Sequence, residues 1–181
     1  MDSSAAEEIV SSETVYRGRL INVKLVKVNI SGKLYHREVV DHPGAVALIP
    51  ILGEQIILIR QFRLAAGRFL YEVPAGTLKV GEAPEECAAR ELLEETGYRA
   101  GSLRHLFTCF VAPGYSTELI HFYLASELSL SSQCLDEDES IQVCPMPMER
   151  AVKMVYNNEI EDAKTIVGVM LLHRYLSLQP S

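Results

Sequence analysis

The stretch "GTLKVGEAPEECAARELLEETGY", residues 76–98, decides how the rest of the sequence is interpreted. Pro84 suits the first position of a helix, and the two glutamates that follow it suit the positive end of the helix dipole. Gly97 suits the left-handed residue that ends a helix. These local signals predict a helix from about residue 84 to residue 96.

Three carboxylates of this helix, Glu91, Glu94 and Glu95, gather within roughly 100° on one side. The apolar positions form another arc, which we expect to face a sheet: Ala88, Ala89, Leu92, Leu93 and Thr96. A solvated charged face is the ordinary explanation of such a helix, but it would pair Glu with Lys or Arg three or four residues on. Like charges at the spacing of Glu91 and Glu95 instead cost roughly 0.2–0.5 kcal/mol. Because hard divalent cations take carboxylate oxygens, the cluster predicts a site for Mg²⁺.

Outside this segment, the sequence predicts mainly β-strands. Residues 15–42 alternate apolar and polar side chains around a turn at Ser31-Gly32-Lys33, which predicts antiparallel strands with one wet face. Two short apolar runs on either side of Gly53-Glu54 predict a hairpin buried on both faces. Asn157-Asn158 predicts a break between two helical runs near the end. The remaining strand-like and helical runs cover residues 69–78, 103–114, 118–128, 141–147, 148–160 and 162–178.

This order of elements lacks the regular alternation of strand and helix that a doubly wound parallel sheet requires, so it predicts an α+β sandwich. At 181 residues the chain is expected to form one domain. We expect a flexible acidic tail over residues 1–14 and a single domain over 15–181. Within the domain, antiparallel strands occupy 15–43 and the core occupies 44–181.

The composition is that of a globular protein, with 48% hydrophobic and 23% charged residues. A net charge of −7 without a Lys or Arg cluster argues against a nucleic-acid partner and leaves a cation to neutralise any phosphate ligand. The four cysteines form no CxxC pair, which argues against a zinc site and favours reduced thiols. Without a signal-peptide pattern or an 18-residue apolar run, we expect a cytoplasmic protein with no membrane partner.

The spacing of residues in the opening stretch resembles the Nudix box. In chain order the fixed positions are Gly76, Glu82 after five residues, Arg90-Glu91-Leu92 after seven more, then Glu94-Glu95 and Gly97. The resemblance implies the Nudix fold, an α/β/α sandwich around a mixed β-sheet. It also implies an enzyme that cleaves a nucleoside diphosphate linked to another group.

The resemblance assigns roles within the box. Glu82 and Arg90 correspond to residues that support the loop and its carboxylates by hydrogen bonds. Glu94 corresponds to a residue that also assists a bound water. The implied cofactor is Mg²⁺, with Mn²⁺ as the alternative. The implied metal ligands are the backbone carbonyl of Ala75 and the carboxylates of Glu91, Glu94 and Glu95.

Four stretches outside the box resemble ADP-ribose pyrophosphatases: "HPGAVALIPI", "IRQFRLAAG", "YEVPAG" and "APGYSTE". In the last of them, Pro113 lies where those enzymes characteristically have a proline. The resemblance implies Mg²⁺-dependent hydrolysis of ADP-ribose to AMP and ribose 5-phosphate. It implies that Arg63 contacts the diphosphate, that Glu118 reaches a ribose or its phosphate, and that Glu72 faces the site.

The base that activates water is implied to lie in the acidic loop "LDEDESIQV", where Glu137 and Glu139 both match and neither is preferred. Each of these residues also has a plainer interpretation. The acidic loop would then be a solvated surface, Arg63 would form a surface ion pair, and Glu118 would be an exposed strand-start residue.

The sequence leaves three other points open. The substrate could be GDP-mannose, another nucleotide sugar, or a flavin or nicotinamide dinucleotide. A remote alternative is a binding module that holds ADP-ribose without cleaving it, although such modules typically lose box carboxylates. The resemblance further implies a homodimer whose N-terminal strands cross to the partner, with Tyr16, Tyr35 or Phe69 stacking on the base.

Overall fold

A computed structural model describes residues 6–131 and 140–177 of the chain. The chain divides into two compact units. One contains the residues up to Gly44 together with Cys109–Ile120, and the other contains Ala45–Thr108 and the chain from His121 onward. The first unit thus combines the N-terminal strands with a segment that lies far away in the sequence.

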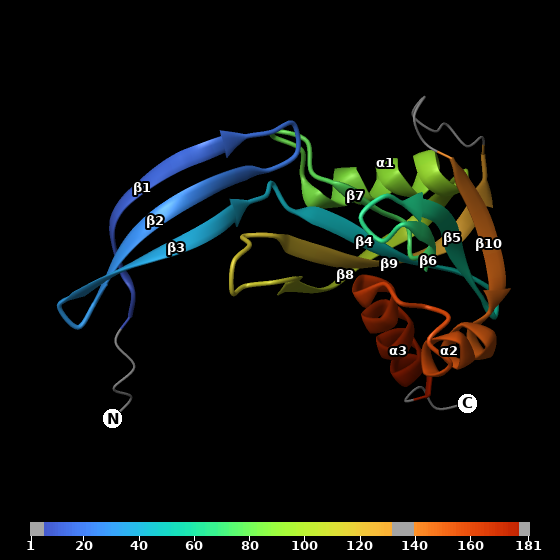
Figure 1. Ribbon diagram of the computed structural model, residues 1–181. Helices are drawn as coiled ribbons and strands as arrows, with labels where there is room; N and C mark the ends of the chain where they lie inside the picture. The colour runs from blue at the N-terminus through green and yellow to red at the C-terminus, as the bar shows by residue number, and fades with distance from the viewer. Residues whose placement is uncertain (1–5, 132–139, 178–181) are drawn as a thin grey trace. The chain divides into compact units, whose positions relative to one another are not determined.

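The first unit is built on a three-stranded antiparallel sheet in the order β1-β2-β3 (Figure 1). The predicted turn between β2 and β3 is present, with positive φ angles of 51° at Ser31 and 82° at Gly32. The loop from residue 109 to 120 is tied to the end of β3, because the Val40 amide donates to the Tyr115 carbonyl at 2.7 Å. The strands are β1 (Glu8–Arg17), β2 (Asn22–Ile30) and β3 (Lys33–Asp41).

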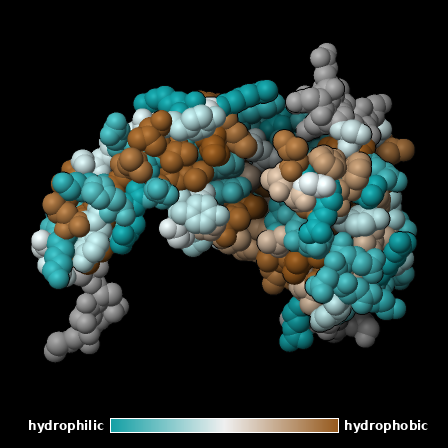
Figure 2. All heavy atoms as spheres, in the orientation of Figure 1, coloured by the Kyte–Doolittle hydropathy of each residue, from teal (hydrophilic) through white to brown (hydrophobic). Residues whose placement is uncertain are grey.

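The first strand corrects the expectation of a flexible tail over residues 1–14. Strand β1 begins at Glu8 and pairs with β2 along its length, from Glu8 opposite Asn29 to Arg17 opposite Asn22. The start of this strand has no alternation of apolar and polar residues, so the sequence did not predict it. Its pairing depends on backbone hydrogen bonds, which any side chain allows. Both faces of the sheet leave apolar side chains exposed, and brown spheres over β1–β3 in Figure 2 show part of this surface. The most exposed aliphatic side chains of this region are Ile9, Val10, Val15, Leu20 and Leu34.

The second unit is built on a seven-stranded sheet whose main path runs β10-β5-β4-β9-β8, with β6 paired to β5 and β7 paired to β4. The predicted hairpin around Gly53-Glu54 is confirmed as β4 and β5, and both strands are largely buried. The strands are β4 (Ala45–Leu52), β5 (Gln55–Arg63), β6 (Arg68–Glu72), β7 (Ala75–Thr77), β8 (Tyr98–Phe110), β9 (Leu119–Leu130) and β10 (Ile141–Pro147).

Helices cover both faces of this sheet, which confirms the predicted α/β/α sandwich. Val46 and Leu48 of β4 pack in one cluster with Ala88 and Leu92 of α1. On the other face, Gly168 of α3 lies against Ile49, where a β-carbon would stand 3.3 Å from the Ile49 side chain. Alternate residues of β4 therefore face opposite layers. Figure 1 shows α1 on one side of the sheet and α3 on the other. The helices are α1 (Pro84–Thr96), α2 (Met148–Tyr156) and α3 (Ala163–Ser177), with the predicted break between the last two.

Helix α1 has the predicted limits because its ends are fixed locally. Pro84 occupies the first position, and the Glu86 carboxylate accepts a hydrogen bond from the Ala83 amide at 3.2 Å. Gly97 adopts the left-handed conformation with φ of 75°, and its amide donates to the Leu93 carbonyl at 2.9 Å. The buried arc differs from the prediction, since Ala89 is exposed while Cys87 and Glu95 are buried.

Candidate active site

The loop before α1 and the helix itself meet through a glycine and a glutamate. A β-carbon built on Gly76 would stand only 1.9 Å from the carboxyl carbon of Glu91. Glycine is therefore required at residue 76 because the Glu91 carboxylate occupies the space of its side chain. This contact fixes the Glu91 carboxylate against the β7 backbone.

Arg90 lies at the centre of the acidic cluster and bonds to three carboxylates. Its Nε and Nη2 donate to both oxygens of Glu82, at 2.7 and 2.9 Å. Its Nη1 donates to Glu91 at 2.5 Å and to Glu94 at 2.9 Å. The guanidinium also reaches the Thr77 carbonyl at 3.4 Å. Arg90 thus connects the loop before the helix to two of the helix carboxylates.

This network shifts the acidity of its members. Hydrogen bonds from Arg90, together with one from the Lys79 amide, lower the pKa of Glu82 to about 2. The hydrogen bond to Glu82 in turn raises the pKa of Arg90 above its ordinary value. Burial raises the pKa of the neighbouring Cys87 thiol to about 12. Glu82 is therefore held in its ionised form, while Cys87 stays a neutral thiol.

Glu95 is the most buried of the helix carboxylates, with 3% of its surface exposed. Its Oε2 accepts a hydrogen bond from the Ala75 amide at 2.9 Å. Ala75, whose backbone carbonyl is a predicted metal ligand, therefore contacts Glu95, a predicted carboxylate ligand. Glu91 and Glu95 both lie against the same two-residue segment of β7, Ala75-Gly76.

A second charged cluster lies at the ends of β5 and β6. Arg63 donates from Nε and Nη2 to the two oxygens of Glu72, at 2.7 and 2.8 Å. Lys164, at the start of α3, donates to the same carboxylate at 2.5 Å and to Asp162 at 3.1 Å. Burial would raise the pKa of Glu72, but the hydrogen bonds from Arg63 and the charge of Lys164 lower it below its ordinary value. The charge of Glu95 contributes to raising the pKa of Arg63, behind the hydrogen bond to Glu72, so the two clusters act on one another.

The start of α3 is tied to the same part of the sheet by buried hydrogen bonds. Asp162 caps the helix by accepting from the Thr165 amide at 2.9 Å and from the Thr165 hydroxyl at 2.6 Å. The Thr165 hydroxyl oxygen also accepts from the Val73 amide at 2.8 Å. The residue after Glu72 is thereby fixed to the first turn of α3.

The chemistry of these residues fits a hard divalent cation. Three carboxylates of the box bond to one guanidinium and the box adds a fourth carboxylate at Glu95, so a surplus of negative charge is left for a cation to neutralise. Among the described residues, no three His, Cys, Asp or Glu side chains yet converge on one point. Glu91 and Glu94 each accept a hydrogen bond from Arg90 instead.

The structure brings together most, but not all, of the residues predicted for the site. Ala75, Glu82, Arg90 and the three helix carboxylates form one cluster, while Arg63 and Glu72 form the neighbouring one. Glu72 is 1% exposed and has both oxygens bonded, so here it supports Arg63 rather than presenting an oxygen to a ligand. Glu118 belongs to the other unit, where its amide donates to the Ser116 hydroxyl. Glu137 and Glu139 lie outside the described residues.

The sequence analysis missed Lys164 and Asp162. The available signal was the Asp-x-x-Thr spacing before α3, which is typical of a helix start. This spacing does not predict the contact between Lys164 and Glu72, which are 92 residues apart.

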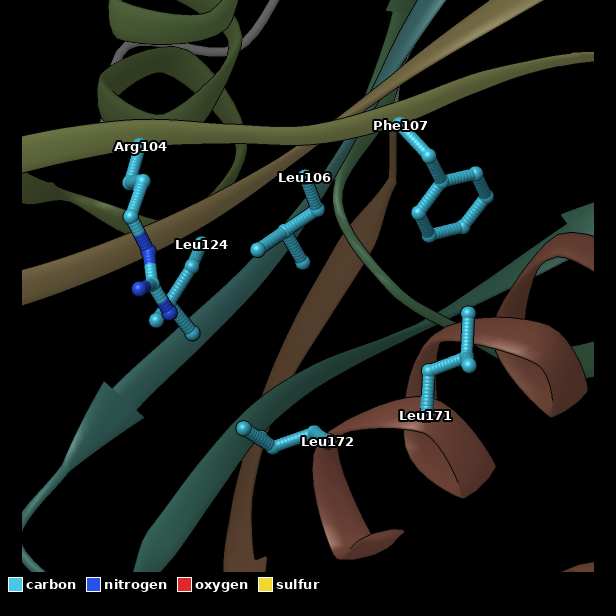
Figure 3. Close-up of a pocket in the computed structure, with 6 residues that line it drawn as sticks. All are labelled: Arg104, Leu106, Phe107, Leu124, Leu171 and Leu172. Carbon is cyan, nitrogen blue, oxygen red and sulfur yellow. The ribbon is translucent and has the colours of Figure 1, made fainter. Parts of the chain in front are cut away.

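A separate pocket of about 170 Å³ lies between β8, β9 and α3 (Figure 3). Its walls are apolar except for Arg104. Because hydrolysis of a diphosphate needs acids and cations to act on charged oxygens, this lining does not suit that chemistry. Its residues are Arg104, Leu106, Phe107, Leu124, Leu171 and Leu172.

Comparison with known protein families identifies the family of this chain. A family model described as NUDIX domain matches residues 41–167. The chain belongs to the NUDIX family. The family resemblance stated from the sequence is therefore confirmed, and members of this family generally use a divalent metal ion.

Three NUDIX relatives have lengths similar to that of this chain. An ADP-ribose pyrophosphatase of Bacillus subtilis is 39% identical over 180 residues, which is 97% of each chain. A GDP-mannose pyrophosphatase of Citrobacter koseri is 37% identical over 177 residues, which is 91% of each chain. A crystal structure of an ADP compounds hydrolase matches with a TM-score of 0.86 at 26% identity, covering 98% of this chain and 97% of that one. Separately, no helix in the described part of the chain has the length and apolar character needed to cross a membrane.

Proposed function

We propose that this NUDIX enzyme hydrolyses ADP-ribose at the diphosphate, so that ADP-ribose and water give AMP and ribose 5-phosphate. The observation that carries the proposal is the packing of Glu91 and Glu95 against Ala75-Gly76, in a chain that matches an ADP-ribose pyrophosphatase over 97% of both lengths. The neighbouring Arg63 adds a cation suited to a diphosphate.

The residues of the box would hold the metal ion, for which we propose Mg²⁺ with Mn²⁺ as an alternative. Glu91, Glu94, Glu95 and the Ala75 carbonyl are the proposed ligands. When bound, the ion screens the diphosphate oxygens and lowers the pKa of a bound water. Arg90 and Glu82 would keep the helix and the loop in register, since their bidentate pair joins α1 to the loop before it.

Substrate binding is assigned to cationic and polar groups of this chain. Arg63 would donate to the diphosphate. Glu72 holds its Nε and Nη2 in place, and 43% of the Arg63 side chain stays exposed to a ligand. Glu118 is proposed to contact a ribose or its phosphate. We keep Glu137 and Glu139 as the candidates for the base that accepts a proton from water, with Glu94 assisting that water.

A substrate panel tests the proposal. ADP-ribose, GDP-mannose, NADH and FAD are each incubated with the enzyme, with and without Mg²⁺, and the nucleotide products are separated by chromatography. We expect kcat/KM to be highest for ADP-ribose, with AMP as the nucleotide product. A higher value for GDP-mannose would favour the second candidate, which the Citrobacter koseri relative supports. Tight calorimetric binding of ADP-ribose without any product would instead favour the non-catalytic module.

We also propose a homodimer in the cytoplasm. The exposed apolar residues of β1–β3 support association through this sheet, since apolar patches of that kind mark interaction surfaces. The described cysteines Cys87, Cys109 and Cys144 are free thiols, which supports a reducing compartment. Light scattering of the native protein should give twice the chain mass of 20.2 kDa. The change Val15→Glu should shift it toward the monomer, while a parent already monomeric would contradict the proposal.

A further inference from the structure

Lys164 stands out because its role is not explained by the helix that carries it. It lies in the first turn of α3, its side chain is only 15% exposed, and its ammonium group points to a carboxylate on β6. Burying a lysine is unfavourable unless it is paired, so the contact with Glu72 accounts for its position.

Glu72 is shared between two cations. Its Oε1 accepts from Arg63 alone, whereas its Oε2 accepts from both Arg63 and Lys164. The carboxylate is 1% exposed, so its orientation is set by these partners rather than by water. Two donors on Oε2 fix the plane of the carboxylate, and the bidentate pair with Arg63 transmits that plane to the guanidinium.

The remaining atoms of Arg63 are the ones that matter for binding. Within the described residues, Glu72 holds Arg63 through Nε and Nη2, and Nη1 makes no hydrogen bond. The Arg63 side chain is 43% exposed. A guanidinium held along one edge therefore presents its other edge in a fixed direction, which suits an anion with two adjacent oxygens.

The backbone beside Glu72 is held by the same helix turn. The Val73 amide, the Thr165 hydroxyl and the Asp162 carboxylate form a chain of hydrogen bonds at 2.8 and 2.6 Å. Asp162 also accepts from Lys164 at 3.1 Å, which directs the lysine toward Glu72. The first turn of α3 thus holds both the side chain of Glu72 and the backbone that follows it.

From these contacts we propose that Lys164 is a positioning residue for substrate binding: it orients Glu72, and through Glu72 it aims Arg63 at the substrate diphosphate. This inference rests on the proposed function. It assigns to α3 a part in the site that neither the box nor the strands carrying Arg63 and Glu72 reveal.

A double-mutant cycle tests the inference, using Lys164→Met, Glu72→Gln and the two changes together. We expect Lys164→Met to raise the KM for ADP-ribose about tenfold and to leave kcat within about twofold. Calorimetry with EDTA should give a similar rise in the dissociation constant. In the Glu72→Gln background, Lys164→Met should add less than about twofold, because its effect passes through Glu72. The matched control is Lys153→Met, which removes an exposed lysine of α2 and should leave KM unchanged.

Two results would overturn the inference. If the single effects multiply in the double variant, Lys164 acts on the substrate directly or at long range. If Lys164→Met has the KM of the parent, the residue has no part in binding. Should Lys164→Met fail to fold, Lys164→Gln replaces it in the same cycle, since the shorter neutral amide removes the ammonium charge that faces Glu72.

The failure of the proposed function can be told apart from the failure of this inference. A parent enzyme that neither binds nor cleaves ADP-ribose refutes the proposed function. The melting temperatures of the same four proteins then test the coupling of Lys164 to Glu72 without any substrate. A double variant that loses much less than the sum of the single losses supports the coupling, and additive losses overturn it.

Discussion

The contact between Gly76 and Glu91 gives the sharpest test of the metal site, through the single change Gly76→Ala. The new β-carbon would lie 1.9 Å from the Glu91 carboxyl carbon and 2.0 Å from Oε1. To restore ordinary contact at 3.4 Å, the carboxylate must retreat by about 1.5 Å, since van der Waals overlap of this size is not tolerated in a packed interior. The short bond from Arg90 to Glu91 must break at the same time.

The expected loss follows from the size of this displacement. A ligand oxygen must stay within about 0.2 Å of its ideal distance from a metal, so a shift of about 1.5 Å removes Glu91 from the site. Misplacement by about 1 Å typically costs on the order of 100-fold in rate. We therefore expect kcat/KM for ADP-ribose to fall at least 100-fold, about 2.7 kcal/mol. Stability should fall by only about 1–3 kcal/mol, as for other overpacked sites.

The assay compares steady-state hydrolysis of ADP-ribose at saturating Mg²⁺ with urea unfolding of the same samples. The matched control is Gly53→Ala, in the turn between β4 and β5. Gly53 has φ of 59° and no atom within 4 Å of its built β-carbon, so alanine there adds backbone strain of roughly 1–2 kcal/mol without a clash. The control should lose stability but keep its kcat/KM. A Gly76→Ala enzyme within about fivefold of the parent would refute the role given to this contact.

Three further outcomes are expected. Glu95→Gln should abolish nearly all Mg²⁺-dependent turnover while circular dichroism stays that of the parent, and activity within a few-fold would contradict its assignment as a ligand. Because the pKa of Glu82 is lowered from 4.5 to about 2, its contribution to stability is complete above pH 4.5 and is lost as the pH falls toward 2. The difference in unfolding free energy between the parent and Glu82→Gln should therefore shrink from pH 5 to pH 3, and a constant difference would argue against the shift. With its pKa near 12, Cys87 should resist iodoacetamide at pH 8 in the native protein and react only after unfolding, as peptide mass spectrometry would reveal.

The sequence predicted those features that are set by neighbouring residues. Helix α1 has its predicted limits because Pro84 and Gly97 each act on the adjacent backbone. The box motif predicted which carboxylates would gather, but not why Gly76 was needed, since that reason is a contact in space with Glu91. The start of β1 was missed because Ser11 and Ser12 pair through the backbone, and no hydrophobic alternation records such pairing.

Long-range partners were beyond the reach of the sequence for a different reason. Lys164 and Glu72 are 92 residues apart, and both are common charged residues in positions with ordinary surface explanations. Only the fold, which brings α3 onto the sheet beside β6, makes them a pair. The same holds for the hydrogen bond from Val73 to Thr165, which no local pattern announces.

The Arg90 guanidinium in the centre of the acidic cluster affects how the protein can fold before it binds a metal ion. Arg90 provides an internal counter-charge to Glu82, Glu91 and Glu94, so newly synthesised chains can complete the acidic helix without waiting for a metal supply. With Glu91 and Glu94 as the proposed ligands, an ion would compete with Arg90 for their oxygens. Occupancy should accordingly track the free cation concentration around the finished protein, and chelation should silence the enzyme reversibly while leaving it folded.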